Sequence, residues 1–422
     1  MSLNQTPRSE RIHISIFGRT NSGKSSLINK ITDQNVSLVS DIKGTTTDPV
    51  SKSMEFFPLG PAIITDTAGL DDETALGNLR TERTLQVLNT TDIALLMIDS
   101  TVGTDSFETS ILREIKDRGL PYFLIINKID LADKSAQLKI IDSFHSDTDR
   151  CIPVSTKTGE NIELLKEKIS HLALDVSNKL SASSGKRLLA DLIETDDLVI
   201  LVVPIDESAP KGRLILPQQQ TIRDILDAHG ICMVTQPSEL SKTLVRAQSA
   251  FHQPPKMVIT DSQVFGEVSR IVPKEIPLTS FSILFARYKG ELSSLMTSVR
   301  QIEELKENDT LLISEGCTHH RQCGDIGSVK IPNWLQKYTG KSFQFEYSSG
   351  NSFPTELSKY RMIIHCGGCM LQEKEMKSRI ARAKRQNVPI VNYGILISYL
   401  KGILERSTQM FQETLPKRNR CL

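Results

Sequence analysis

Two cysteines and a histidine stand close together in the stretch IIHCGGCM, residues 363–370, which follows a run of apolar residues. Thiolates and imidazoles are ligands that bind soft transition metals. Cys366 and Cys369 therefore fit a redox pair, part of a zinc site, part of an iron–sulfur site, or two core thiols beside a glycine turn. The stretch by itself leaves these four alternatives open.

Most of the other soft ligands lie in the same part of the chain. Four of the seven cysteines and three of the eight histidines fall between residues 317 and 369. They are Cys317, Cys323, Cys366, Cys369, His319, His320 and His365. A disulfide framework is not expected, because the thiols of a long cytosolic chain stay reduced. This clustering indicates a metal site.

Cys317 and the pair Cys366 and Cys369 each follow an apolar run that predicts a strand, TLLISEG and YRMIIH. If both strands lie parallel in one sheet, the three thiolates emerge at the same edge. Gly367 and Gly368 allow the backbone to curl so that the thiolates of the pair face one centre. Three cysteines with an unsettled fourth ligand fit either a [4Fe–4S] cluster with an exchangeable position or a Cys₃His zinc site.

A second group of residues, near the N-terminus, has the spacing of a phosphate-binding loop. The stretch GRTNSGKSS, from Gly18, fits the pattern G-x-x-x-x-G-K-S/T between a predicted strand and a predicted helix. Lys24 is expected to reach the terminal phosphates, and Ser25 to offer its hydroxyl to Mg²⁺. The N-terminus of the following helix favours the anion.

Three further segments each follow a predicted strand. They are DTAG (66–69), NKID (127–130) and STK (155–157). Asp66 can hold Mg²⁺ through water, and the N–H of Gly69 can meet the γ-phosphate. Asp130 can accept both N–H groups of a guanine edge, which adenine does not supply. The order of the motifs at the carboxyl ends of strands predicts that the nucleotide is GTP.

The predicted nucleotide-binding set combines these motifs. Its members are Asn21, Ser22, Gly23, Lys24, Ser25, Ser26, Asp66, Gly69, Asn127, Lys128, Asp130, Ser155, Thr156 and Lys157.

The elements that must position these residues follow from the hydrophobic pattern. From residue 11 to about 173, short β-branched runs alternate with amphipathic stretches, which predicts a mostly parallel sheet covered by helices. The segment NKLSASSGK, 178–186, is expected to be a linker. The fold class is therefore α/β, with three consecutive domains at 1–177, 186–270 and 275–422, the first a P-loop domain.

Composition and charge exclude several classes of function. The 51 Lys and Arg residues nearly balance the 50 Asp and Glu residues, so no global field draws the chain to nucleic acid or membrane. The N-terminus lacks the apolar region of a signal peptide, and no stretch has the ~18 apolar residues of a membrane span. A cytoplasmic location is expected.

Residues 11–173 resemble the TrmE–Era group of translation-factor-class GTPases. The stretch GTTTDPV, 44–50, is similar to the GTTRD switch of that group, with Thr47 where the group has Arg. The resemblance implies that Thr46 binds Mg²⁺ together with Ser25, and that Asn21 helps to coordinate K⁺.

The switch after DTAG departs from the pattern of GTPases with a catalytic glutamine. Leu70 stands at that position. Slow intrinsic GTP hydrolysis, stimulated by K⁺ or by a partner, is therefore expected. The general base is not identified by the sequence; the acidic residues 71–73 are candidates, or part of a solvated switch loop.

Taken together, the GTPase motifs, the middle α/β unit and the pattern C-x-H…H-C-x-x-C resemble the family of [FeFe]-hydrogenase maturation GTPases over the whole chain. The resemblance implies that Cys317, Cys366 and Cys369 ligate a [4Fe–4S] cluster. The fourth position would be held weakly by His319 or left open for exchange. Cys323 lies outside the family motif but is close enough in sequence to be a fourth ligand, and His365 would support the ligands.

This resemblance implies a scaffold or carrier. The chain would receive the di-iron precursor of the hydrogenase H-cluster, made with radical-SAM maturases, and deliver it to apo-[FeFe]-hydrogenase, with GTP hydrolysis in a regulatory role. The middle domain would form a homodimer, which apolar strands such as LVILVVP (198–204) permit, although a buried parallel strand would show the same pattern.

The alternative is a TrmE- or Era-like GTPase that acts on RNA and carries a structural zinc site in its last domain. Against it, the last domain has no aromatic and basic stacking face, and the basic run 377–386 fits a solvated helix. A radical-SAM enzyme would show C-x₃-C-x₂-C within one loop, which the sequence lacks.

Overall fold

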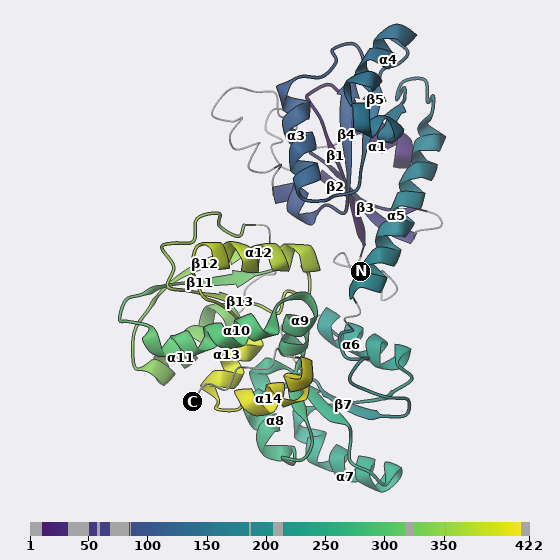
Figure 1. The fold of residues 1–422 in the computed structure, drawn as a ribbon. Helices are drawn as coiled ribbons and strands as arrows, with labels where there is room; N and C mark the ends of the chain where they lie inside the picture. Colours follow the sequence, from purple (N-terminus) through teal and green to yellow (C-terminus); the bar gives the residue numbers. More distant parts are fainter. Residues whose placement is uncertain are drawn as a thin grey trace. The chain divides into compact units, whose positions relative to one another are not determined.

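The computed structural model describes residues 11–32, 50–56, 60–67, 84, 86–184, 187–205, 214–316, 325–350 and 352–414. Three β-sheets with covering helices form this part of the chain (Figure 1). The chain divides into two compact units, Met1–Gly185 and Lys186–Leu422. The predicted fold class, consecutive α/β units beginning with a P-loop domain, is confirmed.

The first unit contains a six-stranded sheet with the strand order β2-β3-β1-β4-β5-β6. Its strands are β1 (Ile12–Phe17), β2 (Val50–Phe56), β3 (Gly60–Asp66), β4 (Ile93–Asp99), β5 (Tyr122–Asn127) and β6 (Cys151–Pro153). Neighbouring strands pair in parallel, except β2 with β3. The first six residues of β4 are all buried, as expected for a central strand of a sheet covered on both faces.

Helices cover both faces of this sheet. Helices α1 (Lys24–Thr32) and α5 (Ile162–Ser184) pack on one face through residues such as Leu27 and Leu165. Helices α3 (Ser106–Asp117) and α4 (Lys134–Ser143) pack on the other through Ile115 and Ile140. The short helix η2 (His145–Arg150) precedes β6.

The stretch 178–186, expected to be a linker, is helical as far as Ser184 because α5 continues to that residue, and the boundary between the two compact units falls at its end, between Gly185 and Lys186. Once a helix is nucleated, each added residue costs little, so the Ser-rich stretch extends the helix that the packed residues before it begin.

The second unit contains two four-stranded parallel sheets, with the orders β10-β9-β7-β8 and β12-β11-β13-β14. The strands are β7 (Leu198–Val202), β8 (Ile231–Thr235), β9 (Met257–Thr260), β10 (Leu278–Ser280), β11 (Thr310–Glu315), β12 (Gln344–Ser349), β13 (Met362–His365) and β14 (Ile390–Asn392). One hydrophobic core runs through both sheets and their helices.

The helices of the second unit lie between these strands in the sequence. They are α6 (Leu216–Asp227), α7 (Leu240–Phe251), α8 (Phe265–Ile271), α9 (Phe281–Lys289), α10 (Leu292–Val299), α11 (Ile331–Thr339), α12 (Glu373–Arg385), α13 (Tyr393–Leu400) and α14 (Leu404–Thr408). Shorter helical turns are η3 (Pro237–Glu239), η4 (Ser262–Val264), η5 (Arg300–Glu304), η6 (Ile326–Lys330) and η7 (Gln409–Thr414).

The second sheet differs from the sequence expectation in its extent. Strand β10, Leu278–Ser280, pairs with β9, so this sheet extends beyond the boundary expected between residues 270 and 275. Of the two interpretations of the apolar strand β7, the structure supports a buried parallel strand, since β7 lies between β9 and β8 with all five residues buried, and β8 is an edge strand among the described residues. The apolar run of β7 therefore reflects its central position.

Among the described residues, no helix is both long enough and apolar enough to cross a membrane.

Candidate functional site

The phosphate loop connects β1 to α1, and glycine is required at two of its positions. Gly18 and Gly23 have φ angles of +149° and +98°, which residues with a side chain rarely adopt. A Cβ atom on Gly23 would lie 2.2 Å from Nδ2 of Asn127, and one on Gly18 would lie 2.8 Å from the carbonyl oxygen of Met97. The absence of side chains thus lets the loop lie directly against β4 and the end of β5.

Lys24 and Ser25 begin α1 and face the end of β3. The ammonium of Lys24 donates to the carbonyl oxygens of Gly18 (2.8 Å) and Arg19 (2.6 Å). The hydroxyl of Ser25 donates to Oδ2 of Asp66 at 2.6 Å. Hydroxyl and carboxylate oxygens are ligands that Mg²⁺ prefers, and the N-terminus of α1 attracts phosphate. The arrangement therefore suits a nucleotide with bound Mg²⁺.

Asn127, at the end of β5, joins the loops around the site and is fully buried. Its Nδ2 donates to the carbonyl oxygen of Ser22 at 2.9 Å and to Oγ1 of Thr156 at 3.2 Å. Its Oδ1 accepts a hydrogen bond of 3.0 Å from the N–H of Thr156. Since a buried amide without partners costs about 1–3 kcal/mol, these bonds hold the phosphate loop and the STK loop in register.

Asp130 and Lys128 are fixed by neighbouring loops. The hydroxyl of Ser155 donates to Oδ1 of Asp130 at 2.7 Å, and the ammonium of Lys128 lies 2.5 Å from Oδ2 of Asp99. Burial alone would raise the pKa of Asp99, but hydrogen bonds from Lys128 and Thr101 outweigh it and hold the pKa below its usual value. The ion pair with Asp99 thus holds the side chain of Lys128 in place beside the nucleotide cavity.

These loops surround a cavity of about 450 Å³ at the carboxyl edge of the first sheet. Its lining includes the predicted residues Asn21, Gly23, Lys24, Ser25, Ser26, Asn127, Lys128, Asp130, Thr156 and Lys157, and also Leu131. Ser22 and Ser155 do not line the cavity, but each is bonded to a residue that does. Thr46, Gly69, Leu70 and the acidic residues 71–73 lie outside the described residues.

Sequence reasoning missed one ion-pair group at the phosphate loop. The guanidinium of Arg19 pairs with Glu108 at 2.8 Å and with Asp105, the residues that form the capping box of α3. Burial alone would lower the pKa of Arg19, but these carboxylates outweigh it and raise that pKa. The D-x-x-E spacing at 105–108 was the local signal for a helix start, although not for its contact with Arg19.

Asp130→Asn is expected to weaken GTP binding about a hundredfold, because it removes the carboxylate that is predicted to accept from the guanine edge. Binding of xanthosine triphosphate should improve instead, since its ring offers an acceptor where guanine has a donor. Titration calorimetry with both nucleotides measures the change, with Asp142→Asn on the exposed face of α4 as the control. Unchanged GTP affinity would contradict the assigned role of Asp130.

The cysteine loop follows β13 in the third sheet. Strands β11 and β13 pair in parallel, with Ser314 opposite His365, so the condition for convergence at one sheet edge is met. The N–H groups of Gly316 and Gly368 point to Sγ of Cys366 at 3.0 and 3.4 Å. Gly316 directly precedes Cys317 in the chain.

The two described thiols of this loop lie in apolar surroundings. Burial raises the pKa of Cys366 to about 11, and the nearby Cys369 adds to the rise. Burial also raises the pKa of Cys369, opposed by the positive charge of Lys289. Such thiols are neutral near pH 7 until a metal replaces their protons.

His365 is fully buried, and both of its ring nitrogens have partners. Its Nε2 faces a guanidinium nitrogen of Arg379 at 3.1 Å, and its Nδ1 lies 2.9 Å from the carbonyl oxygen of Cys366. Because a guanidinium only donates, Nε2 is the acceptor and Nδ1 donates. Burial, and then the charge of Arg379, lower the pKa of His365 to about 3. The ring is therefore neutral and supports the backbone of Cys366.

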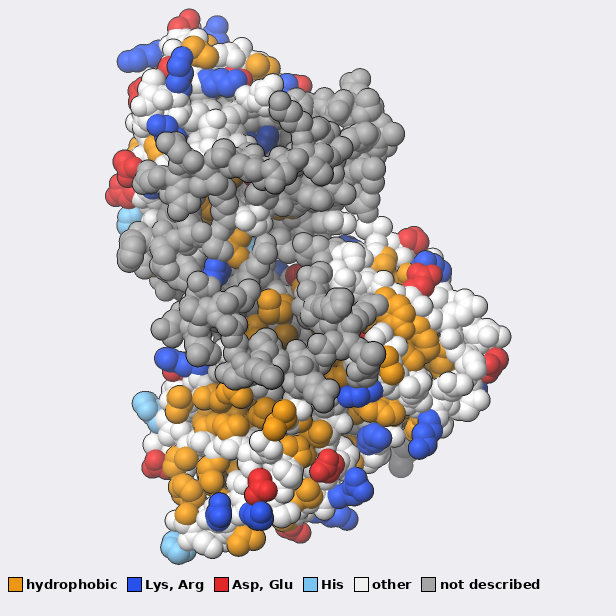
Figure 2. Space-filling view, turned by 180° about the vertical axis from the view of Figure 1, so that it is seen from behind, with side chains coloured by type: hydrophobic (Ala, Val, Ile, Leu, Met, Phe, Trp, Pro, Cys, Tyr) orange, Lys and Arg blue, Asp and Glu red, His pale blue; other side chains and the backbone are white. Residues whose placement is uncertain are grey.

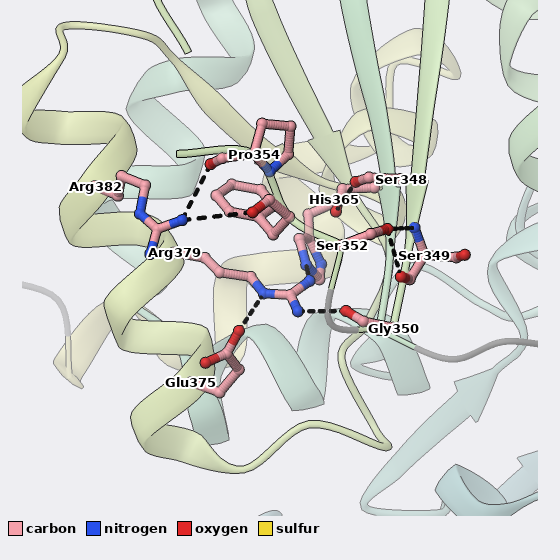
Figure 3. A network of polar contacts seen from close by, with 12 residues as sticks. Ser348, Ser349, Gly350, Ser352, Pro354, His365, Glu375, Arg379 and Arg382 are labelled. Atoms are coloured by element: carbon pink, nitrogen blue, oxygen red, sulfur yellow. Dashed lines mark hydrogen bonds and ion pairs between the residues drawn. The ribbon is translucent and has the colours of Figure 1, made fainter. Parts of the chain in front are cut away.

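Arg379 is itself held on several sides, which fixes the ring that it contacts. Nε donates to Glu375 at 2.8 Å, and another nitrogen donates to the carbonyl oxygen of Gly350 at 2.6 Å (Figure 3). The ring of Phe353 lies 5.0 Å from the guanidinium carbon. No local sequence pattern predicts the hydrogen bond between Arg379 and Gly350, because the two residues are 29 positions apart.

The remaining predicted ligands, Cys317 and His319, lie outside the described residues, as do His320 and Cys323. Within the described ranges, no three His, Cys, Asp or Glu side chains are grouped as a metal site would require. The structure thus places two of the four predicted ligands.

The fold and the ordered motifs define the first unit as a P-loop GTPase domain, a class that binds GTP with Mg²⁺. Residues 13–128 accordingly match the family model of the 50S ribosome-binding GTPases. Residues 188–290 match the hydrogen maturase F dimerization domain, and residues 293–410 match the hydrogen maturase F tetramerization domain. The chain belongs to the hydrogen maturase F family.

Curated relatives match the GTPase part. The tRNA modification GTPase MnmE of Chromobacterium violaceum is 34% identical over 161 residues, 38% of this chain and 34% of MnmE. The GTPase Der of Mycoplasmopsis agalactiae is 32% identical over 199 residues, 44% of each chain. The chain thus spans about a third to under half of the length of these relatives.

Solved structures with low overall similarity include a probable GTP-binding protein EngB, with 23% identity and a TM-score of 0.33 over 39% of this chain and 99% of EngB. Another is the G domain of the Thermotoga maritima FeoB iron transporter, with 22% identity and a TM-score of 0.30 over 39% and 99%.

Proposed function

We propose that this chain is a GTP-hydrolysing scaffold that holds a [4Fe–4S] cluster and carries the di-iron precursor of the H-cluster to apo-[FeFe]-hydrogenase. The observation that carries this proposal is the hydrogen bond from Gly316 to Cys366. It brings the residue that precedes Cys317 against the loop of Cys366 and Cys369. Both residues of this contact lie within the hydrogen maturase F tetramerization-domain match, 293–410, and the dimerization-domain match, 188–290, precedes it in the chain.

The described residues fit an iron–sulfur cluster in their chemistry. Two thiols stand three positions apart, glycine N–H groups point to one sulfur, and apolar residues surround the loop. Cys366, Cys369 and Cys317 would hold the cluster, with His319, Cys323, another group or no protein ligand at the fourth position. When bound, the cluster would supply an iron coordination site and one-electron chemistry.

The GTPase domain would act as the regulator of this scaffold. Lys24 would bind the β- and γ-phosphates, while Ser25, Thr46 and Asp66 would hold Mg²⁺ and Gly69 would meet the γ-phosphate. GTP would order the switch segments and hydrolysis would release them, which would change the surface offered to partners. The partners would be radical-SAM maturases and the apo-hydrogenase.

Exposed apolar side chains near one edge of the second sheet favour self-association of the chain. Strand β8 forms an edge of this sheet among the described residues, and Val234 on β8 is 49% exposed. Leu226 on α6 and Val245 on α7 are exposed as well. Figure 2 shows hydrophobic side chains gathered over this part of the second unit. We infer that two copies associate through the β8 edge, because an exposed apolar edge strand readily pairs with another chain.

Anaerobic reconstitution with iron and sulfide tests the cluster. The wild-type protein should gain the optical absorption and, after reduction, the EPR signal of a [4Fe–4S] cluster. Cys366→Ser should retain about a tenth of this signal or less, because one of three thiolate ligands is lost. Cys232→Ser, on β8, is the matched control.

A colourless protein with one tightly bound zinc would instead support the structural zinc of the RNA-associated alternative. A cluster that survives Cys366→Ser would contradict the ligand assignment. Cys323→Ala addresses the fourth position, since an unchanged cluster favours an open or histidine-held site.

GTP hydrolysis should be about tenfold faster in K⁺ than in Na⁺, which is about 1.4 kcal/mol in activation free energy. Asn21, with a φ of +62°, lines the nucleotide cavity and is the proposed K⁺ ligand. Asn21→Gly keeps the backbone conformation accessible and removes the amide oxygen, so the two salts should then give equal rates. The rate of phosphate release gives the rate of GTP hydrolysis for the wild type and for Asn21→Gly in each salt. Equal rates in K⁺ and Na⁺ for the wild type would exclude K⁺ activation.

Val234→Lys should weaken dimerisation at least about tenfold, because a charge on an edge strand opposes pairing with another strand. Sedimentation velocity over a range of protein concentrations measures the change. Leu138→Lys, an equally exposed apolar position on α4, is the control. A dimer unaffected by Val234→Lys would place the interface elsewhere.

A further inference from the structure

Lys289, the last residue of α9, carries an ammonium that is almost completely buried. The residue is 3% exposed, although lysine is rarely buried unless its charge is compensated. None of the GTPase motifs or the cysteine motif includes it. A buried charge at this position therefore requires an explanation.

The compensation comes from the turn that carries Cys369. Nζ of Lys289 donates to the carbonyl oxygens of Cys369 and Leu371, at 2.8 Å each, and lies 3.4 Å from that of Gly368. The ring of Phe285 lies 5.3 Å from the same ammonium. Hydrogen bonds from a charged donor are stronger than neutral ones, so one side chain holds the carbonyl groups of three of the four residues 368–371.

The helix that presents Lys289 begins in the second sheet. Helix α9 follows β10 directly, and the side chain of Ser280 caps it by accepting from the N–H of Ile283. Lys289 lies within the dimerization-domain match, whereas the turn at 368–371 lies within the tetramerization-domain match. The contact therefore fixes the cysteine turn to an element of the neighbouring domain.

The ammonium also places a positive charge beside the cysteines. It opposes the rise in the pKa of Cys369 that burial causes. A positive charge in low-dielectric surroundings stabilises a neighbouring centre more when that centre is more negative. Reduction makes an iron–sulfur cluster more negative, and charges around a cluster are among the factors that set its potential.

We propose that Lys289 is the positioning residue of the cysteine loop: its ammonium holds the turn 368–371 in place and raises the reduction potential of the cluster bound there. We call the set of hydrogen bonds from Lys289 to the turn 368–371 the clamp. This part of the proposal follows from the contacts of Lys289 and does not depend on a bound cluster. The effect on potential rests on the proposed [4Fe–4S] binding, so two separate measurements are needed.

Hydrogen exchange of the metal-free, full-length protein tests the clamp. Lys289→Met keeps an aliphatic side chain of similar length but removes the charge and the donors. Amides in the peptide that covers 366–371 should exchange at least about tenfold faster, a local loss of about 1.4 kcal/mol. Lys337→Met, at an exposed lysine of α11, is the matched control. Wild-type exchange rates in Lys289→Met would overturn the clamp.

If Lys289→Met does not fold, Lys289→Gln takes its place, because its side chain is uncharged and one bond shorter, and therefore does not restore the bonds that the ammonium makes to Cys369 and Leu371. Faster exchange confined to 366–371 would again support the clamp, and wild-type rates would overturn it.

An EPR-monitored redox titration of the reconstituted protein tests the charge. At a fixed potential, the ratio of reduced to oxidised cluster should fall about tenfold in Lys289→Met or Lys289→Gln, which is a shift of about 59 mV to lower potential. Lys289→Arg keeps the charge and should restore the wild-type value. An unchanged potential in the neutral variant would overturn this part of the proposal. A wild-type protein that gains no cluster would instead refute the proposed function, and the exchange result would stand independently.

Discussion

Parallel strand pairing is the constraint on which both candidate sites depend. In the first sheet it brings the ends of β1, β3, β5 and β6 to one edge, where their loops surround the nucleotide cavity. In the third sheet it aligns β11 with β13, so the residue before Cys317 meets the loop of Cys366. Segments far apart in the sequence thus converge without special loop lengths, because the sheet itself sets their spacing.

Buried polar side chains then fix the loops that the sheets bring together. Asn127 bonds to the phosphate loop and to Thr156, and Arg379 bonds to His365, which lies against the carbonyl of Cys366. Lys289 holds the opposite end of the cysteine turn. Each of these groups would be costly to bury without its partners, so the loops have one strongly favoured arrangement.

The features that could be predicted from the sequence are those that short local patterns encode. The phosphate loop and the guanine loop lie where their motifs place them, and ten of the predicted residues line one cavity, because each motif is short and follows a strand directly. The contacts of Arg19 with Glu108, of Lys289 with Cys369 and of Arg379 with His365 were not predicted, since they join residues 14 to 89 positions apart and leave no periodic signal. Helix α5 extends into the Ser-rich stretch that was expected to be a linker, because a nucleated helix tolerates Ser residues at its end.

Helix α9 connects the start of the second unit to the cysteine turn through two side chains near its end. Near its end, Arg287 bonds to Asp191 and to the carbonyl oxygens of residues 187 and 188, where the chain enters this unit. Two residues later, Lys289 holds the cysteine turn. Positions two apart do not share a helix face, so the body of α9 separates the two contacts. A displacement of residues 187–191 must therefore either break the bonds of Arg287 or move the helix that carries Lys289.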